Sequence, residues 1–196
     1  MIFNKALGLA TAFAALASAI PHPPHRARGG STPSVSPTSS ASPSSSGGAG
    51  GGGVQIKNNL DQNVYLWSVG STADNEMHTL SPNGGTYSEN WQTPSGGGGV
   101  SIKLATKPDQ SDVLQYEYTV GGDLIYWDLS VINMGQDSEF TKYGFAVEPS
   151  QPGGNCPSAV CKAGDTACSD AYLFPTDDHA THGCPIDTAF TLEIGQ

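Results

Sequence analysis

The sequence is short of basic residues and of long apolar runs. Its 196 residues contain 8 Lys and Arg against 18 Asp and Glu, and no arginine follows Arg28. A protein that binds nucleic acid clusters Lys and Arg to displace the counterions of the phosphates, so we expect no nucleic-acid partner. Beyond the first twenty residues, no apolar run approaches the roughly 18 residues that a membrane-spanning helix needs, so we expect no membrane span.

The first 53 residues have the composition of segments that precede a fold. Lys5 is followed by an apolar run from Ala6 to Leu16 and by Ala17-Ser18-Ala19, the pattern of a signal peptide over residues 1–19. Residues 20–53 are rich in Pro, Ser and Gly and are predicted to form a disordered leader and linker, either O-glycosylated or an unmodified spacer. We therefore expect a secreted, extracellular protein, associated with a cell wall or a host surface.

Residues 54–196 are predicted to form one all-β domain. Apolar and polar residues alternate in short runs, as where Val100, Ile102 and Leu104 point to one face, and Gly121-Gly122-Asp123 is typical of a hairpin turn. Helical spacing of apolar residues is absent, so we expect an antiparallel β-sandwich. The runs predicted as strands are 54–57, 63–69, 99–106, 113–120, 124–129, 143–147 and 189–194.

All four cysteines lie in the last quarter of the chain, at Cys156, Cys161, Cys168 and Cys184. In an exported protein an even number predicts two disulfides, and four cysteines allow three connectivities. Zinc binding is the alternative, but paired C-x2-C motifs are absent and the expected compartment is oxidising. We expect disulfides to stabilise a loop region near the C-terminus that has few strand signals.

Several motifs in residues 54–196 resemble those of the thaumatin-like proteins. The run Cys168-Ser169-Asp170-Ala171-Tyr172 leads to Pro175-Thr176-Asp177-Asp178, which is similar to the family's C-terminal signature. The run Tyr126-Trp127-Asp128-Leu129-Ser130-Val131 and the segment around Glu117 resemble two of its strand motifs, and Tyr65-Leu66-Trp67 is similar to its opening strands. The overall pattern is closest to the small fungal branch of secreted yeast-phase-specific and antigenic proteins.

The resemblance implies a thaumatin-like β-sandwich and a disulfide pairing. Cys156 and Cys161 match two family cysteines whose partners match Cys184 and Cys168, which implies Cys156–Cys184 and Cys161–Cys168. Larger members of the family carry a disulfide-rich insert that forms one wall of the ligand cleft, and this chain lacks it. We therefore expect a shortened cleft.

Acidic residues are the candidates for a binding or catalytic site. All 18 acids lie in residues 54–196, against five lysines, so this part has a net charge of −13. The family's cleft is lined by one Arg, one Glu and three Asp. Glu117 and Asp128 match the Glu and the first Asp. Asn133 stands at the position of the second Asp, and Asp177 or Asp178 matches the last. Ser101 falls near the Arg position, and Lys103 shares its face. The implied ligand-binding set is Lys103, Glu117, Asp128, Asn133, Asp177 and Asp178.

Two carboxyls on adjacent strands could also cleave a glycosidic bond, one protonated and one ionised. The function we expect is non-catalytic binding of β-glucan through an acidic cleft, helped by exposed aromatic rings. The alternatives are a weak endo-β-1,3-glucanase, with Glu117 as acid and Asp128 as its partner, and an effector or inhibitor that binds a foreign protein. Asp177-Asp178-His179-x-x-His182 could hold a metal, but a polar loop closed by disulfides explains it equally, so we expect no metal and no cofactor.

Overall fold

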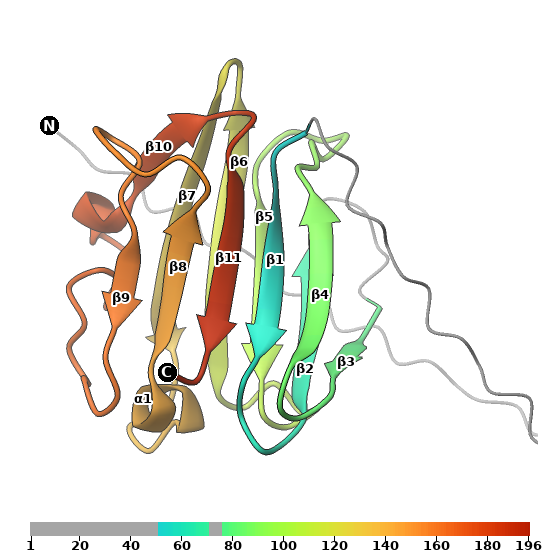
Figure 1. The fold of residues 1–196 in the computed structure, drawn as a ribbon, viewed down its shortest axis with the longest axis vertical. Helices are drawn as coiled ribbons and strands as arrows, with labels where there is room; N and C mark the ends of the chain where they lie inside the picture. Colours follow the sequence, from blue (N-terminus) through green and yellow to red (C-terminus); the bar gives the residue numbers. More distant parts are fainter. Residues whose placement is uncertain (1–50, 71–75) are drawn as a thin grey trace, which may run out of the picture. The chain divides into compact units, whose positions relative to one another are not determined.

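The computed structural model describes residues 51–70 and 76–196, which form two packed β-sheets (Figure 1). The predicted signal peptide and nearly all of the predicted linker lie outside the described residues. One sheet has five strands in the order β4-β1-β11-β8-β9. Its strands are β1 (Gly53–Asn58), β4 (Gly85–Asn90), β8 (Phe145–Pro149), β9 (Ala159–Cys161) and β11 (Ala189–Ile194).

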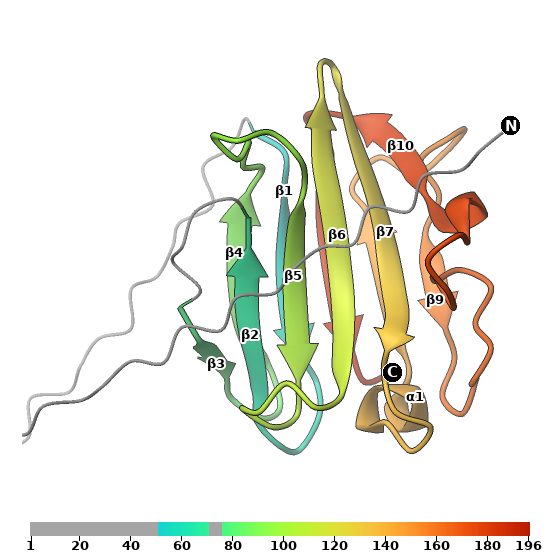
Figure 2. The ribbon, with the colours of Figure 1, turned by 180° about the vertical axis from the view of Figure 1, so that it is seen from behind.

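The second sheet has six strands in the order β10-β7-β6-β5-β2-β3; it lies behind the first in Figure 1 and in front of it in Figure 2. Its strands are β2 (Val64–Val69), β3 (His78–Leu80), β5 (Val100–Ala105), β6 (Val113–Gly121), β7 (Leu124–Asn133) and β10 (His182–Pro185). Helix α1 (Glu139–Tyr143) and a single 3-10 turn (Asp178–Ala180) are the helical elements of the described residues. In these ranges no helix has the length and apolar character that a bilayer crossing requires.

The core lies between the sheets and follows the alternation read from the sequence. Ile102 and Leu104 of β5 and Leu192 and Ile194 of β11 are completely buried. On β6 and β7 the large aromatics Tyr116 and Trp127 and their neighbours fill the same interior. Because successive strand residues point to opposite faces, the polar residues between them are presented on the outer face of the six-stranded sheet. The predicted all-β sandwich is confirmed, with all neighbouring strands antiparallel except β1 and β11, which are parallel.

Two disulfides fasten the C-terminal third of the chain to the sandwich. Cys156 pairs with Cys184 and Cys161 with Cys168, the same pairing that the resemblance implies. Cys184 lies on β10, and Trp127 of β7 donates a hydrogen bond from its indole Nε1 to the Cys184 sulfur at 3.3 Å. The first disulfide therefore ties the loop between β8 and β9 to β10, which pairs with β7, and the second closes the loop after β9.

Candidate functional site

Glu117 on β6 and Asp128 on β7 are direct partners across the antiparallel pair. The hairpin turn at Gly122, whose φ is 68°, sets this register. Both side chains lie on the outer face of the six-stranded sheet, because their neighbours along each strand, Tyr116 and Trp127, point the other way and are buried in the core. Directly opposed residues have Cβ atoms about 4.5–5.5 Å apart, so the two carboxyls are close neighbours.

The two carboxyls lie in a pocket of about 470 Å³ on this face. Residues of β5, β6 and β7 line its floor, and residues of the segment that follows Cys168 line one wall. Strands β5, β6 and β7 lie side by side in Figure 2. Its polar lining includes Ser101, Glu117, Tyr126, Asp128, Tyr172 and Asp178. The pocket thus gathers three carboxyls, and none of the described residues that line it is basic.

Tyr172 positions the wall of the pocket. Its backbone N–H donates to the carbonyl of Leu129 at 2.8 Å, and its carbonyl accepts from the N–H of Val131 at 3.0 Å, so this segment runs alongside β7. Its hydroxyl is 2.5 Å from Thr181 Oγ1 and donates to Asp178 Oδ1 at 3.4 Å. The side chains of Tyr172, Asp178 and Thr181 are therefore held together at the rim.

Burial has a strong electrostatic effect on Asp128. Desolvation, followed by repulsion from the Glu117 carboxylate, raises the pKa of Asp128 from 3.8 to about 7. Its Oδ1 atom is buried and has no hydrogen-bond partner among the described residues. The ion pairs of the described part of the chain, Lys57–Glu193, Lys142–Glu139 and His179–Asp177, do not include Glu117 or Asp128. Asp128 therefore keeps one buried oxygen to which no described residue hydrogen-bonds, beside a second carboxyl that lines the same pocket.

Three of the six residues expected to bind ligand lie outside this pocket. In the register of β5 and β6, Lys103 lies opposite Gln115, whereas Ser101 lies opposite Glu117. Lys103 is therefore on the same face as Glu117 but further along the strand. Asn133 lies further along β7, beyond an irregularity in the register, and its Oδ1 accepts from Gln115 Nε2 at 3.3 Å. Asp177 is buried, accepts from the backbone N–H of Leu173 at 3.0 Å, and pairs with His179 at 3.1 Å. The pocket brings together Glu117, Asp128 and Asp178.

The histidines of the C-terminal loop have structural partners. His179 contacts Asp177, whereas His182 packs against Trp127 with ring centroids 5.0 Å apart, and burial lowers the pKa of His182. Within residues 51–70 and 76–196, no three His, Cys, Asp or Glu side chains are arranged to hold a metal ion.

The aromatic side chains divide by exposure. Tyr116, Tyr118, Trp67 and Trp127 are buried, whereas Tyr126 is 43% exposed and lines the pocket. Sequence reasoning did not select Tyr172 or Thr181 as site residues. Their contribution depends on a loop running back along β7, and no local sequence pattern encodes that approach.

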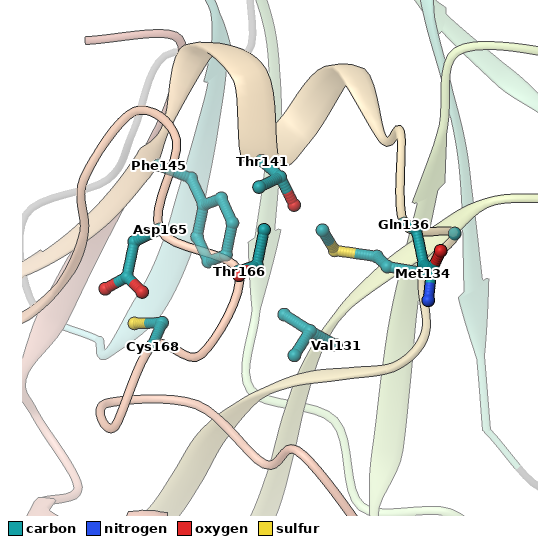
Figure 3. Close-up of a pocket in the computed structure, with 9 residues that line it drawn as sticks. Val131, Met134, Gln136, Thr141, Phe145, Asp165, Thr166 and Cys168 are labelled. Carbon is teal, nitrogen blue, oxygen red and sulfur yellow. The ribbon is translucent and has the colours of Figure 1, made fainter.

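A second pocket, of about 480 Å³, lies near the far end of β7 beside α1. Figure 3 shows Val131, Met134 and Thr166 pointing toward its centre, with Phe145 and Asp165 to one side. It contains one carboxyl and none of the residues expected to bind ligand. The paired carboxyls therefore make the pocket on the outer face of the six-stranded sheet the stronger candidate.

Comparisons with known proteins agree on the family and the fold. The family model described as Blastomyces yeast-phase-specific protein matches residues 42–196. The secreted thaumatin-like protein calA of Emericella nidulans is 42% identical over 195 residues, which is 100% of this chain and 98% of that protein. The antigenic thaumatin-like protein of Arthroderma benhamiae is 42% identical over 139 residues, 71% of this chain and 68% of that protein. The crystal structure of the protein elicitor MoHrip2 from Magnaporthe oryzae is similar with a TM-score of 0.57 and 20% identity, over 74% of this chain and 99% of that one.

Proposed function

This chain belongs to the Blastomyces yeast-phase-specific protein family, within the fungal thaumatin-like proteins, and from that premise we propose that it binds a neutral glycan, of the β-glucan class, through the Glu117–Asp128 pocket. It is a secreted protein with two disulfides. A secreted protein meets polysaccharide at cell walls and host surfaces, so a wall glucan is an accessible ligand.

The pairing of Glu117 and Asp128 in one pocket, with no basic residue among its described lining, is the observation that carries this proposal. Sugar hydroxyls are donors and acceptors at once and can hydrogen-bond to both carboxyl groups that line the pocket. A protonated Asp128, with a pKa of about 7, can in turn donate to a sugar oxygen.

The charge of the pocket selects against other ligand classes. Three carboxyls and no basic residue among its described lining repel phosphates, sulfates and uronic acids. A neutral polyhydroxyl ligand has no such penalty. The exposed ring of Tyr126 adds a flat apolar surface, which suits the CH face of a sugar.

A pull-down on insoluble β-1,3-glucan tests the proposal. We expect the wild-type protein to bind, and Glu117→Gln and Asp128→Ala to bind at least tenfold more weakly. Asp61→Asn is the matched control, because Asp61 is exposed, lies in the turn before β2 and does not line the pocket. Failure of the folded wild-type protein to bind any neutral glucan would overturn the proposal, as would unchanged binding by both pocket variants.

The same carboxyl pair also favours a second candidate, hydrolysis of the bound glucan. Because the pKa of Asp128 is raised to about 7, Asp128 would be the proton donor and Glu117 the ionised partner, the reverse of the roles expected from the sequence. Retaining glycosidases place their carboxyls about 5–5.5 Å apart, a separation that directly opposed residues can reach. A reducing-sugar assay on the pulled-down complex separates the candidates. Product that Asp128→Asn abolishes supports hydrolysis, and binding without product rejects it.

A further inference from the structure

Tyr126 lies between two hollows on the surface of the six-stranded sheet. One is the pocket that holds Glu117 and Asp128, and the other is a hollow of about 740 Å³ beyond β10. We call the second the outer hollow; besides Tyr126, it is lined by residues that include Leu124, Asn155, Pro157, His182 and Pro185. Tyr126 and Thr181 line both hollows, so the two are adjoining parts of one surface depression.

Glycines on both sides leave room for the Tyr126 ring. Gly183 of β10 is its direct partner across the strands, and a Cβ atom there would lie 3.4 Å from Cε1. A Cβ atom on Gly121 of β6 would lie 2.7 Å from Cε2 on the opposite edge of the ring. Neither glycine has a positive φ, so backbone conformation does not require glycine at these positions. The space that the ring occupies accounts for the glycine at 121, whereas a Cβ atom at 183 would reach van der Waals contact with the ring.

The outer hollow differs in chemistry from the acidic pocket. None of the described residues that line it is Asp, Glu, Lys or Arg, and burial lowers the pKa of His182, which favours its neutral form. The prolines, the glycines and the Tyr126 ring offer apolar contact, and Asn155 offers an amide. This lining suits a neutral ligand with apolar faces and scattered hydroxyls.

We infer that Tyr126 is a stacking platform between two subsites of one groove, and that the ligand is an extended neutral polysaccharide chain rather than a single sugar or a disaccharide. The inference rests on the proposed function and adds the outer hollow as a subsite. Each hollow falls within the range of about 300–1,000 Å³ that is typical of small-molecule sites, so each can hold a ligand segment of its own, and a ligand that covers both must be an extended chain. A chain that crosses Tyr126 would contact acids on one side and the uncharged hollow on the other.

Calorimetric titration with linear β-1,3-gluco-oligosaccharides of increasing length tests the inference. For the wild type we expect affinity to rise with length until both hollows are covered. Tyr126→Ala should weaken binding of the long oligosaccharides about tenfold and bring their affinity to that of the short ones. Tyr126→Phe should keep the rise of affinity with oligosaccharide length, since the aromatic ring remains. Gly121→Ala places a methyl group where the edge of the Tyr126 ring lies. It should remove the rise of affinity with oligosaccharide length without unfolding the protein.

Phe174→Ala is the matched control, because Phe174 is an exposed aromatic in the neighbouring loop that lines neither hollow. Length-dependent affinity that Tyr126→Ala leaves unchanged, or affinity that does not depend on length, would overturn the inference while the proposed function stands. If oligosaccharides of every length fail to bind the wild type, the proposed function fails and this inference fails with it.

Discussion

Glu117 and Asp128 face each other across the β6–β7 pair, and the burial of Asp128 beside a second carboxyl raises its pKa from 3.8 to about 7. Two like charges this close, with no basic side chain among the described residues of their pocket, destabilise the folded state whenever both are ionised.

Replacing Asp128 by Asn should stabilise the protein at high pH. Unfolded Asp128 titrates near 3.8 and folded Asp128 near 7, so between these values the folded state binds more protons and stability falls as pH rises. The difference between these two pKa values corresponds to about 4 kcal/mol in the free energy of unfolding, which partial solvent exposure of Asp128 reduces to about 2 kcal/mol. Urea unfolding should therefore show Asp128→Asn more stable than the wild type at pH 8 and equal to it near pH 3. Parallel pH profiles for the two proteins would contradict the account.

Replacing Glu117 by Gln should lower the pKa of Asp128 without restoring its ordinary value. Burial is the larger cause of the raised pKa and remains in the variant, whereas repulsion from the Glu117 carboxylate is removed. Carbon-13 NMR titration of the Asp side-chain carboxyls measures this directly. A pKa unmoved by Glu117→Gln would mean that the two carboxyls do not interact.

The two disulfides should differ in their contribution to stability. Cys156–Cys184 joins residues 28 apart in sequence and Cys161–Cys168 residues 7 apart. Loop-closure entropy predicts losses of about 3.5 and 2.5 kcal/mol on removal. Double alanine variants, compared by urea unfolding, check this order. Tryptophan fluorescence should change more on loss of Cys184, since Trp127 donates a hydrogen bond to its sulfur.

Asn58→Ala should destabilise the sandwich by about 3 kcal/mol. The buried Asn58 amide donates to the carbonyls of Gln62, Leu80 and Ser81, and its Oδ1 accepts from the N–H of Leu60 at 3.0 Å. Thermal unfolding measures the loss. Asn59→Ala is the control, because the Asn59 side chain makes one hydrogen bond, to the Gly195 carbonyl, and should cost about 1 kcal/mol.

Strand alternation made most of the fold predictable, and polar strands were missed. The seven runs expected as strands overlap β1, β2, β5, β6, β7, β8 and β11, because each carries buried apolar residues at every second position. Strand β4 is Gly-Thr-Tyr-Ser-Glu-Asn and lies at a sheet edge, where one strand neighbour suffices and few apolar residues are needed. Residue 143 was assigned to a strand but ends helix α1, which is too short for helical periodicity to reveal.

The site was predictable where register alone determines proximity. Glu117 and Asp128 are paired by a two-strand hairpin whose turn is visible in the sequence. Asn133 is separated from them by an irregularity in the β6–β7 register, which alternation cannot foresee. Asp177 and Asp178 are adjacent in sequence, yet Asp177 bonds within its own loop and Asp178 reaches the pocket. Choosing between them requires the loop conformation.

The most direct test is carbon-13 NMR of the Asp and Glu carboxyls during titration with a soluble β-1,3-gluco-oligosaccharide at pH 7. The account predicts that the Asp128 and Glu117 signals shift with ligand concentration, that the pKa of Asp128 changes on saturation, and that the Asp61 signal stays fixed. Saturable binding that leaves the Asp128 and Glu117 signals unmoved would place the ligand elsewhere and contradict the account.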